Sequence, residues 1–131
     1  MRFYVIMPVG SDRLFTEKRT IIQSAAKSEH FIAYFPLDER RDKPFDLYST
    51  LQDMRDSQFV IADLSLERPS CYFELGLAQA MGKPTFLVAE EGTPIHQANG
   101  RSQIMFYRDL EDYRRVISRI LKASHVVLTT A

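Results

Sequence analysis

Two carboxylates, Asp63 and Glu74, are the side chains whose positions best suit chemistry. On a helix, the residues three, four and seven positions after Glu74 share its face, and all of them are apolar. They are Leu77, Ala78 and Met81. An acid on an apolar helix face is costly unless a partner or a ligand compensates its charge. Asp63 follows an apolar run, where a strand is expected to end, so both acids are candidates for a reactive site.

A pair of carboxylates can cleave a glycosidic bond, because the transition state carries positive charge on the sugar. One carboxylate faces the anomeric carbon and the other assists the leaving group, and we expect Glu74 and Asp63 to take these roles in that order. Each residue also has a simpler explanation. Glu74 near a helix start complements the helix dipole, which contributes about 0.3 to 1 kcal/mol, and Asp63 at a strand end caps a loop. The residue types alone leave these alternatives open.

The stretch 57–85 positions both acids and reads as strand, loop, helix and next strand. Residues 59–62 form an apolar, partly β-branched run, which predicts a buried strand. Pro69 and Ser70 then begin a helical pattern that ends at Gly82. In open α/β sheets, ligands bind at the carboxyl ends of the strands. The start of this helix is therefore expected at the ligand-binding edge of a sheet.

The same alternation of strands and helices continues through the chain. Strands are predicted at 2–8, 30–35, 59–63, 84–89 and 103–107, with helices between them. Ser11 or Asp12 is expected to cap the first helix, and Asp109 the last. The pattern predicts an α/β protein, a single-domain flavodoxin-like three-layer sandwich with a five-stranded parallel sheet in the order 2-1-3-4-5. Residues 1–123 form the domain, and residues 124–131 a C-terminal tail that is free to fray, pack back or add an edge strand.

This strand order brings the loop after the first strand, residues 8–13, close to Asp63 and Glu74. Met7 and Pro8 are expected at the mouth of the resulting crevice, and Phe15 to face a base. Gly10 and Ser11 precede a helix start, which suits an anion, although an ordinary strand-to-helix turn needs the same residues. The turn-rich segment 90–102 is expected to form another part of the rim.

The composition excludes several classes of protein. Lys plus Arg and Asp plus Glu both number 17 in the 131 residues, which argues against a nucleic acid polymer or a membrane surface as partner. No apolar run approaches the roughly 18 residues that span a bilayer, and no signal peptide is recognised, so we expect a soluble cytoplasmic protein. The three histidines lack metal-ligand spacing, and a carboxylate pair requires no metal. We therefore expect no metal and no cofactor.

The middle of the chain contains the segments VIAD at 60–63, YFELGLA at 72–78 and GKP at 82–84, and its beginning contains YVIMP at 4–8 and GS at 10–11. The middle segments resemble the nucleoside 2-deoxyribosyltransferase superfamily, which includes deoxynucleoside monophosphate N-glycosidases and short TIR-like prokaryotic relatives. The two early segments resemble the family's first strand and its sugar- or phosphate-binding turn. The resemblance implies that Glu74 attacks C1′ of the sugar. Those enzymes often carry a Tyr near the end of the first strand, where this chain has Met7 and an earlier Tyr4.

A late segment, NGRS at 99–102, resembles a loop that helps to close the site in the nucleotide hydrolases, sometimes from a neighbouring subunit. The resemblance therefore implies that Asn99, Arg101 and Ser102 also bind substrate, and that the protein forms a homodimer. The predicted function is hydrolysis or transfer of an N-glycosidic bond of a nucleoside or nucleotide, with a Glu nucleophile.

Two other functions stay open, and a third is disfavoured. CYFEL at 71–75 also fits the Cys-x-x-Glu-Leu pattern of Toll/interleukin-receptor (TIR) domains, whose Glu cleaves the nicotinamide bond of NAD, so a TIR-like NAD glycohydrolase is the first alternative. A non-catalytic nucleotide-binding or interaction module is the second, because binding needs no nucleophile. A phosphoacceptor receiver domain is disfavoured, because no acidic pair follows the first strand to hold magnesium.

Overall fold

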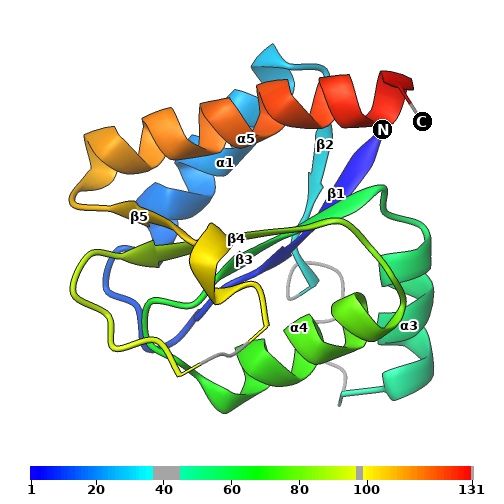
Figure 1. The fold of residues 1–131 in the computed structure, drawn as a ribbon, viewed down its shortest axis with the longest axis horizontal. Coiled ribbons are helices and arrows are strands. Elements are labelled where there is room, and N and C mark those ends of the chain that lie inside the picture. The colour runs from blue at the N-terminus through cyan, green and yellow to red at the C-terminus, as the bar shows by residue number, and fades with distance from the viewer. Residues whose placement is uncertain (37–44, 97–98, 131) are drawn as a thin grey trace.

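The computed structural model of the protein describes residues 1–36, 45–96 and 99–130. Strands and helices alternate along this part of the chain, as the apolar runs predict (Figure 1). The strands are β1 (Arg2–Ile6), β2 (Ile32–Tyr34), β3 (Phe59–Asp63), β4 (Thr85–Glu90) and β5 (Met105–Tyr107). The helices are α1 (Phe15–Ser28), α3 (Leu47–Arg55), α4 (Pro69–Ala80) and α5 (Leu110–Thr130), and a short 3-10 turn, η1 (Arg101–Gln103), precedes β5.

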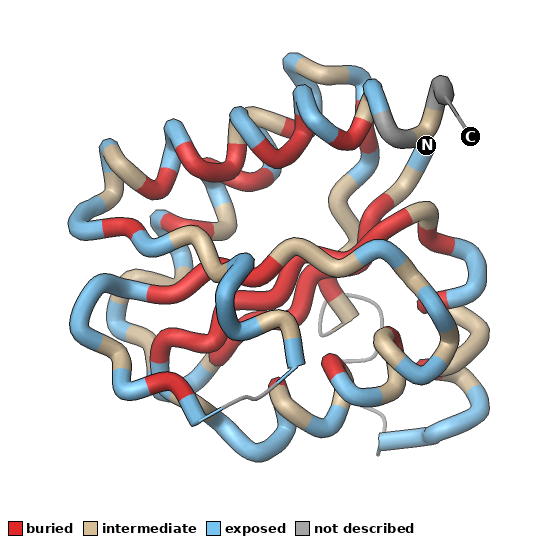
Figure 2. The backbone as a smooth tube through the Cα atoms, in the orientation of Figure 1, coloured by how far each residue is buried: buried red, intermediate tan, exposed pale blue. Residues whose placement is uncertain are grey.

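The strands form one five-stranded sheet in the order β2-β1-β3-β4-β5, and all neighbouring pairs are parallel. This confirms the predicted flavodoxin-like fold and strand order. α1 and α5 cover one face of the sheet, and α3 and α4 cover the other (Figure 1). Because both faces are covered, β3 is buried along its whole length and β1 from Phe3 to Ile6, and Figure 2 shows a continuous buried band through these two strands.

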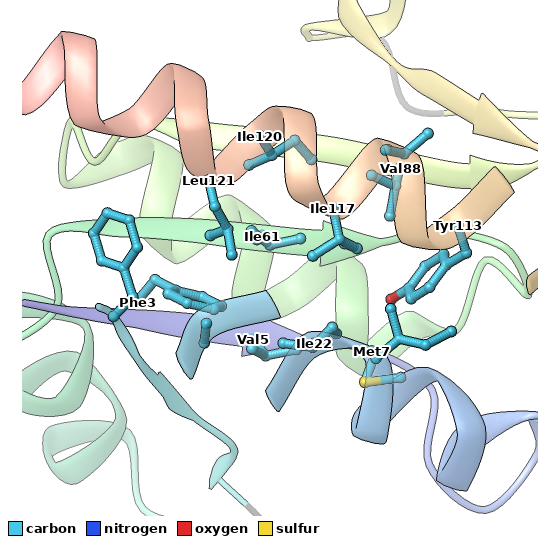
Figure 3. Close-up of a cluster of buried hydrophobic side chains, with 14 of the residues drawn as sticks. Phe3, Val5, Met7, Ile22, Ile61, Val88, Tyr113, Ile117, Ile120 and Leu121 are labelled. Atoms are coloured by element: carbon cyan, nitrogen blue, oxygen red, sulfur yellow. The ribbon is translucent and has the colours of Figure 1, made fainter. Parts of the chain in front are cut away.

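The core between the sheet and the pair α1 and α5 is built from every second strand residue (Figure 3). Phe3 and Phe59 lie on neighbouring strands with their rings stacked 5.0 Å apart. Ile22 of α1 and Ile117 of α5 belong to the same cluster, and both are fully buried. Each large side chain buried in this way stabilises the fold by about 1.5 to 3 kcal/mol relative to exposure.

The alternate strand residues face α3 and α4 and form a second core. Tyr4 and Val60 belong to it, together with Met54 of α3 and Leu75 of α4. The alternation has a consequence for the polar residues of the same strands. Tyr4 faces α4, whereas Asp63, in phase with Phe59, faces α1 and α5.

Two helix starts are capped by aspartates. Asp46 accepts a hydrogen bond from the Ser49 amide at 3.1 Å, and Asp109 accepts one from the Asp112 amide at 2.8 Å, as predicted for the last helix. The predicted cap of the first helix is wrong. α1 begins after Leu14 without a side-chain cap, and Asp12 instead accepts a hydrogen bond from the Leu14 amide at 2.9 Å within the preceding turn.

The last helix, α5, continues to Thr130 without a break. Residues 124–130 are thus helical rather than an edge strand, and the predicted boundary between residues 123 and 124 falls inside α5. Among the helices of the described segments, none is both long enough and apolar enough to cross a membrane.

Candidate active site

A cavity of about 470 Å³ lies at the carboxyl ends of β1 and β2, beside the start of α4. Its volume falls in the range of pockets that hold small molecules. Its walls come from the end of β1 and the turn after it, the start of α1, the residues after β2, and the start of α4. The lining residues are Val5, Met7, Pro8, Val9, Gly10, Ser11, Phe15, Phe35, Pro36, Arg68, Ser70, Cys71 and Glu74.

The sequence predictions and the pocket agree on Glu74 and on the segment after β1. Met7, Pro8, Gly10, Ser11 and Phe15 all line the same cavity as Glu74. These segments meet because β1 and β3 are neighbours in the sheet, and because α4 begins shortly after β3 ends. The edge of the sheet where they meet is the one at which open α/β sheets bind ligands.

Glu74 lies in the second turn of α4 and is partly buried. Burial raises the pKa of its carboxyl from 4.5 to about 7, and a hydrogen bond from the Tyr4 hydroxyl works in the opposite direction. That hydroxyl lies 3.5 Å from Oε2 of Glu74. Near neutral pH the carboxyl therefore populates both its ionised and its protonated form, as a group suited to nucleophilic or acid-base chemistry does.

Tyr4 is the site residue that the sequence prediction missed. The sequence predicted Met7 at the mouth of the crevice, because it lies near the end of the first strand. Tyr4, earlier in β1, is the tyrosine that contacts Glu74. Its ring stacks on Tyr34 at 5.7 Å, and the Tyr34 hydroxyl donates a hydrogen bond to Asp53 at 2.8 Å. The alternation along β1 was the available signal, because it assigns Tyr4 to one face of the sheet and Met7 to the other.

Asp63 does not line the cavity. Its side chain is 2% exposed, and its Oδ2 accepts a hydrogen bond from the Tyr107 hydroxyl at 2.9 Å and lies 3.4 Å from Lys18 Nζ. Its Oδ1 accepts hydrogen bonds from the amide and the hydroxyl of Ser65, at 3.0 and 2.6 Å. The bond from the Ser65 amide is the loop cap that was the simpler explanation for this residue. The predicted pair of Asp63 with Glu74 at one pocket is therefore not formed.

The late segment with Asn99, Arg101 and Ser102 also lies apart from the cavity lining. These three residues are exposed. A Cβ at Gly100, between them, would lie 3.2 Å from the side chain of Leu87 and 4.0 Å from that of Gln79, so the segment packs over β4 and the second half of α4. Residues 97–98 of the predicted rim lie outside the described part of the chain.

Arg68 is a second residue whose importance the sequence left open. It lies directly before α4, and it is the one cation among the described residues that line the cavity. Its neighbours at the start of the helix are Ser70 and Cys71. Burial, then Glu74 and Asp63, raise the pKa of the Cys71 thiol to about 11, so the thiol is protonated and serves as packing. Within the described segments, no cluster of His, Cys, Asp and Glu has the form of a metal site.

No protein-family model matches the sequence, and no curated protein matches it. Solved structures do match. The structure of CMP N-glycosidase BcmB from Clostridium botulinum superposes with a TM-score of 0.69 at 13% sequence identity, and the match covers 92% of this chain and 99% of that one. This chain shares the fold of that enzyme. A 2-deoxyribosyltransferase from Bacillus psychrosaccharolyticus matches with a TM-score of 0.58 at 12% identity, over 87% of this chain and 90% of that one. The predicted resemblance is thus confirmed at the level of the fold.

The raised pKa of Glu74 predicts how its replacement changes stability with pH. An acid whose pKa is higher in the folded protein than in the unfolded chain contributes less stability as pH rises from about 4.5 to about 7. Glu74→Gln is therefore expected to raise the melting temperature at pH 8, with a smaller gain at pH 5. Thermal unfolding between pH 5 and 8 measures this. The exposed Glu91, changed to Gln, is the matched control, and an equal pH trend in both variants would contradict the assignment.

Proposed function

We propose that this protein cleaves the N-glycosidic bond of a nucleoside or nucleotide, with Glu74 as the nucleophile at C1′. The observation that carries the proposal is a partly buried carboxyl with a pKa of about 7, held by Tyr4 at one wall of a cavity of about 470 Å³. The fold shared with a CMP N-glycosidase and a 2-deoxyribosyltransferase supports it.

In the proposed reaction, the ionised carboxylate of Glu74 forms a bond to C1′ as the bond from C1′ to the base breaks. The electron pair of the broken bond leaves with the base, which takes up a proton from solvent. Water, or a second base in a transfer reaction, then attacks C1′, gives up a proton to solvent and releases the carboxylate. The Tyr4 hydroxyl orients Glu74 throughout. Asp63 has no step in this scheme, because its oxygens are engaged by Lys18, Tyr107 and Ser65.

The remaining walls suit the parts of a nucleotide. The turn at Gly10 and Ser11 lines the cavity, and the backbone amides of such a turn can bind an anion or a sugar hydroxyl. Phe15 and Phe35 supply aromatic surface for the base. Arg68 favours a substrate with a phosphate, because a guanidinium forms strong charge-assisted hydrogen bonds to phosphate oxygens.

The homodimer stays a prediction. Asn99, Arg101 and Ser102 lie outside the cavity of their own chain, so a role in binding substrate requires that they reach the cavity of a second copy. We retain them as proposed substrate-binding residues of that assembly.

The central prediction concerns base release. The protein is incubated separately with nucleosides, ribonucleotides, deoxynucleotides and NAD, and free base is measured by chromatography. We expect release from a nucleoside or nucleotide, and a loss on the order of 10³-fold or more in Glu74→Gln, because the nucleophile is removed. Glu91→Gln is expected to retain full activity.

Unchanged release by Glu74→Gln would remove Glu74 from its role. Release of nicotinamide alone selects the NAD glycohydrolase. Ligand-induced stabilisation without release selects the binding module.

The pH dependence is expected to follow Glu74. Only its ionised form attacks C1′, so kcat/KM rises with pH through about 7. The hydrogen bond from Tyr4 lowers the pKa of Glu74, so Tyr4→Phe is expected to move the rising limb to higher pH and to lose more activity at pH 6 than at pH 8.5. Tyr48→Phe, which removes a hydroxyl from an exposed residue of α3, is the control. A limb that stays in place in Tyr4→Phe argues against this coupling.

Because Arg68 lines the cavity, we expect the protein to prefer nucleotides over nucleosides. Arg68→Gln is expected to raise KM for a nucleoside 5′-monophosphate by roughly tenfold or more, because a hydrogen bond to a charged group contributes about 1.5 to 3 kcal/mol. KM for the matching nucleoside should not change. Arg13→Gln, at an exposed position that does not line the cavity, tests for a general charge effect. Equal KM changes for nucleotide and nucleoside would show that Arg68 does not bind the phosphate.

A further inference from the structure

A buried lysine lies behind the pocket, on the α1 side of the sheet. The side chain of Lys18 is 1% exposed, and its Nζ lies 2.6 Å from Asp12 Oδ2, 2.6 Å from the Tyr107 hydroxyl and 3.4 Å from Asp63 Oδ2. Burial disfavours its charged form, but Asp63 and the hydrogen bonds with Asp12 and Tyr107 outweigh this effect. The pKa of Lys18 is therefore raised, and the amine is charged at neutral pH.

The Tyr107 hydroxyl is the centre of this cluster. Besides Lys18 it contacts Asp63 Oδ2 at 2.9 Å and Ser65 Oγ at 2.6 Å. Ser65 Oγ in turn accepts a hydrogen bond from the Glu90 amide at 2.8 Å. One hydroxyl at the end of β5 thus joins the carboxyl ends of β3 and β4 to a side chain of α1.

Both ends of the cluster lead into the walls of the pocket. Asp12 directly follows Gly10 and Ser11, which line the cavity, and its other oxygen accepts the hydrogen bond from the Leu14 amide that shapes this turn. Ser65 begins the loop that leads to Arg68 on the opposite wall. Lys18 and Tyr107 themselves are absent from the described cavity lining.

Stability alone is a weak reason for such an arrangement. Lys18 carries one positive charge, whereas Asp12 and Asp63 carry two negative charges, and all three side chains are at most 8% exposed. Replacing a buried ion cluster by apolar residues is often neutral or stabilising, because desolvation offsets the attraction between the charges. The cluster instead fixes the position of two separate loops relative to each other, because its hydrogen bonds are directional.

We propose that Lys18 and Tyr107 are positioning residues, which hold the Gly10–Ser11 turn and the loop before Arg68 at the separation that binds substrate. The inference rests on the proposed function in taking both loops to contact the nucleotide. Glu74 and Tyr4 lie on the α4 side of the sheet, so loosening the cluster leaves the nucleophile and its hydrogen bond in place. Loss of the cluster therefore weakens binding of the ground state and the transition state alike, which raises KM and leaves kcat unchanged.

A matched pair of tyrosines tests this. Tyr113 packs edge to face on Tyr107 at 4.7 Å and is fully buried at one end of the core in Figure 3. Among the described residues, none pairs with its hydroxyl. Tyr107→Phe is expected to raise KM for cytidine 5′-monophosphate, or its 2′-deoxy form, roughly tenfold with kcat within about twofold. Tyr113→Phe removes a hydroxyl from the same core without a hydrogen bond, and should change neither.

A merely structural role predicts the opposite split. If the cluster only stabilises the fold, Tyr107→Phe lowers the folded fraction, so kcat per total protein falls while KM stays the same, and the proposal is overturned. Equal KM changes in Tyr107→Phe and Tyr113→Phe overturn it too. Lys18→Met combined with Asp12→Asn removes one charge of each sign, which leaves the cluster's net charge unchanged, and should reproduce the KM effect. If this double variant does not fold, Tyr107→Phe decides alone.

A readout without turnover separates this proposal from the proposed function. Hydrogen exchange of the Leu14, Ser65 and Glu90 amides, which bond within the cluster, is expected to accelerate in Tyr107→Phe while the Ile61 amide of β3 stays protected. If the wild-type protein releases no base from any nucleoside or nucleotide and none of them stabilises it, the proposed function fails, and exchange still decides the positioning role. Unchanged exchange at all three cluster amides would then overturn the proposal.

Discussion

The alternation of side chains along two buried parallel strands is the constraint on which the rest of the structure depends. In β1 and β3 every residue is buried or nearly so, and successive side chains go to opposite faces. Tyr4 is thereby directed to α4, where it meets Glu74, and Asp63 is directed to α1, where it meets Lys18. Tyr4 and Asp63 thus belong to different networks, one with Glu74 of α4 and one with Lys18 of α1.

Glu74, the proposed nucleophile, is costly to the stability of the fold. An ionised carboxyl on a partly buried helix face is destabilising, and the same burial brings its pKa close to neutrality. Tyr4 offsets only part of that effect with a hydrogen bond at 3.5 Å. Conflict of this kind between local stability and reactivity is typical of functional sites, and it distinguishes Glu74 from Asp63, whose oxygens are well bonded.

The fold and one half of the site were predictable from the sequence, because apolar periodicity and turn residues report directly on elements and their order. Glu74 was predicted from the apolar face of its helix, Gly10 from the turn before a helix, and Met7 from its place near the end of the first strand. The role of Asp63 could not be predicted in this way, because a position at a strand end does not say on which face of the sheet the side chain lies. The face was nevertheless deducible: right-handed crossovers from β1 to β2 and from β3 to β4 run in opposite directions, so α1 and α4 must cover opposite sides. The contacts of Lys18 and Tyr107 required coordinates, because they join residues 89 positions apart.

The cavity has a further property that follows from its walls. Met7 and Phe15 belong to the core under α1 and α5, whereas Cys71 belongs to the core under α4, so the cavity opens where the two cores meet at the end of β1. A molecule bound there contacts residues of both cores, which elsewhere lie on opposite faces of the sheet. A ligand in this cavity therefore stabilises both layers against local opening, because opening of either one breaks contacts with the ligand.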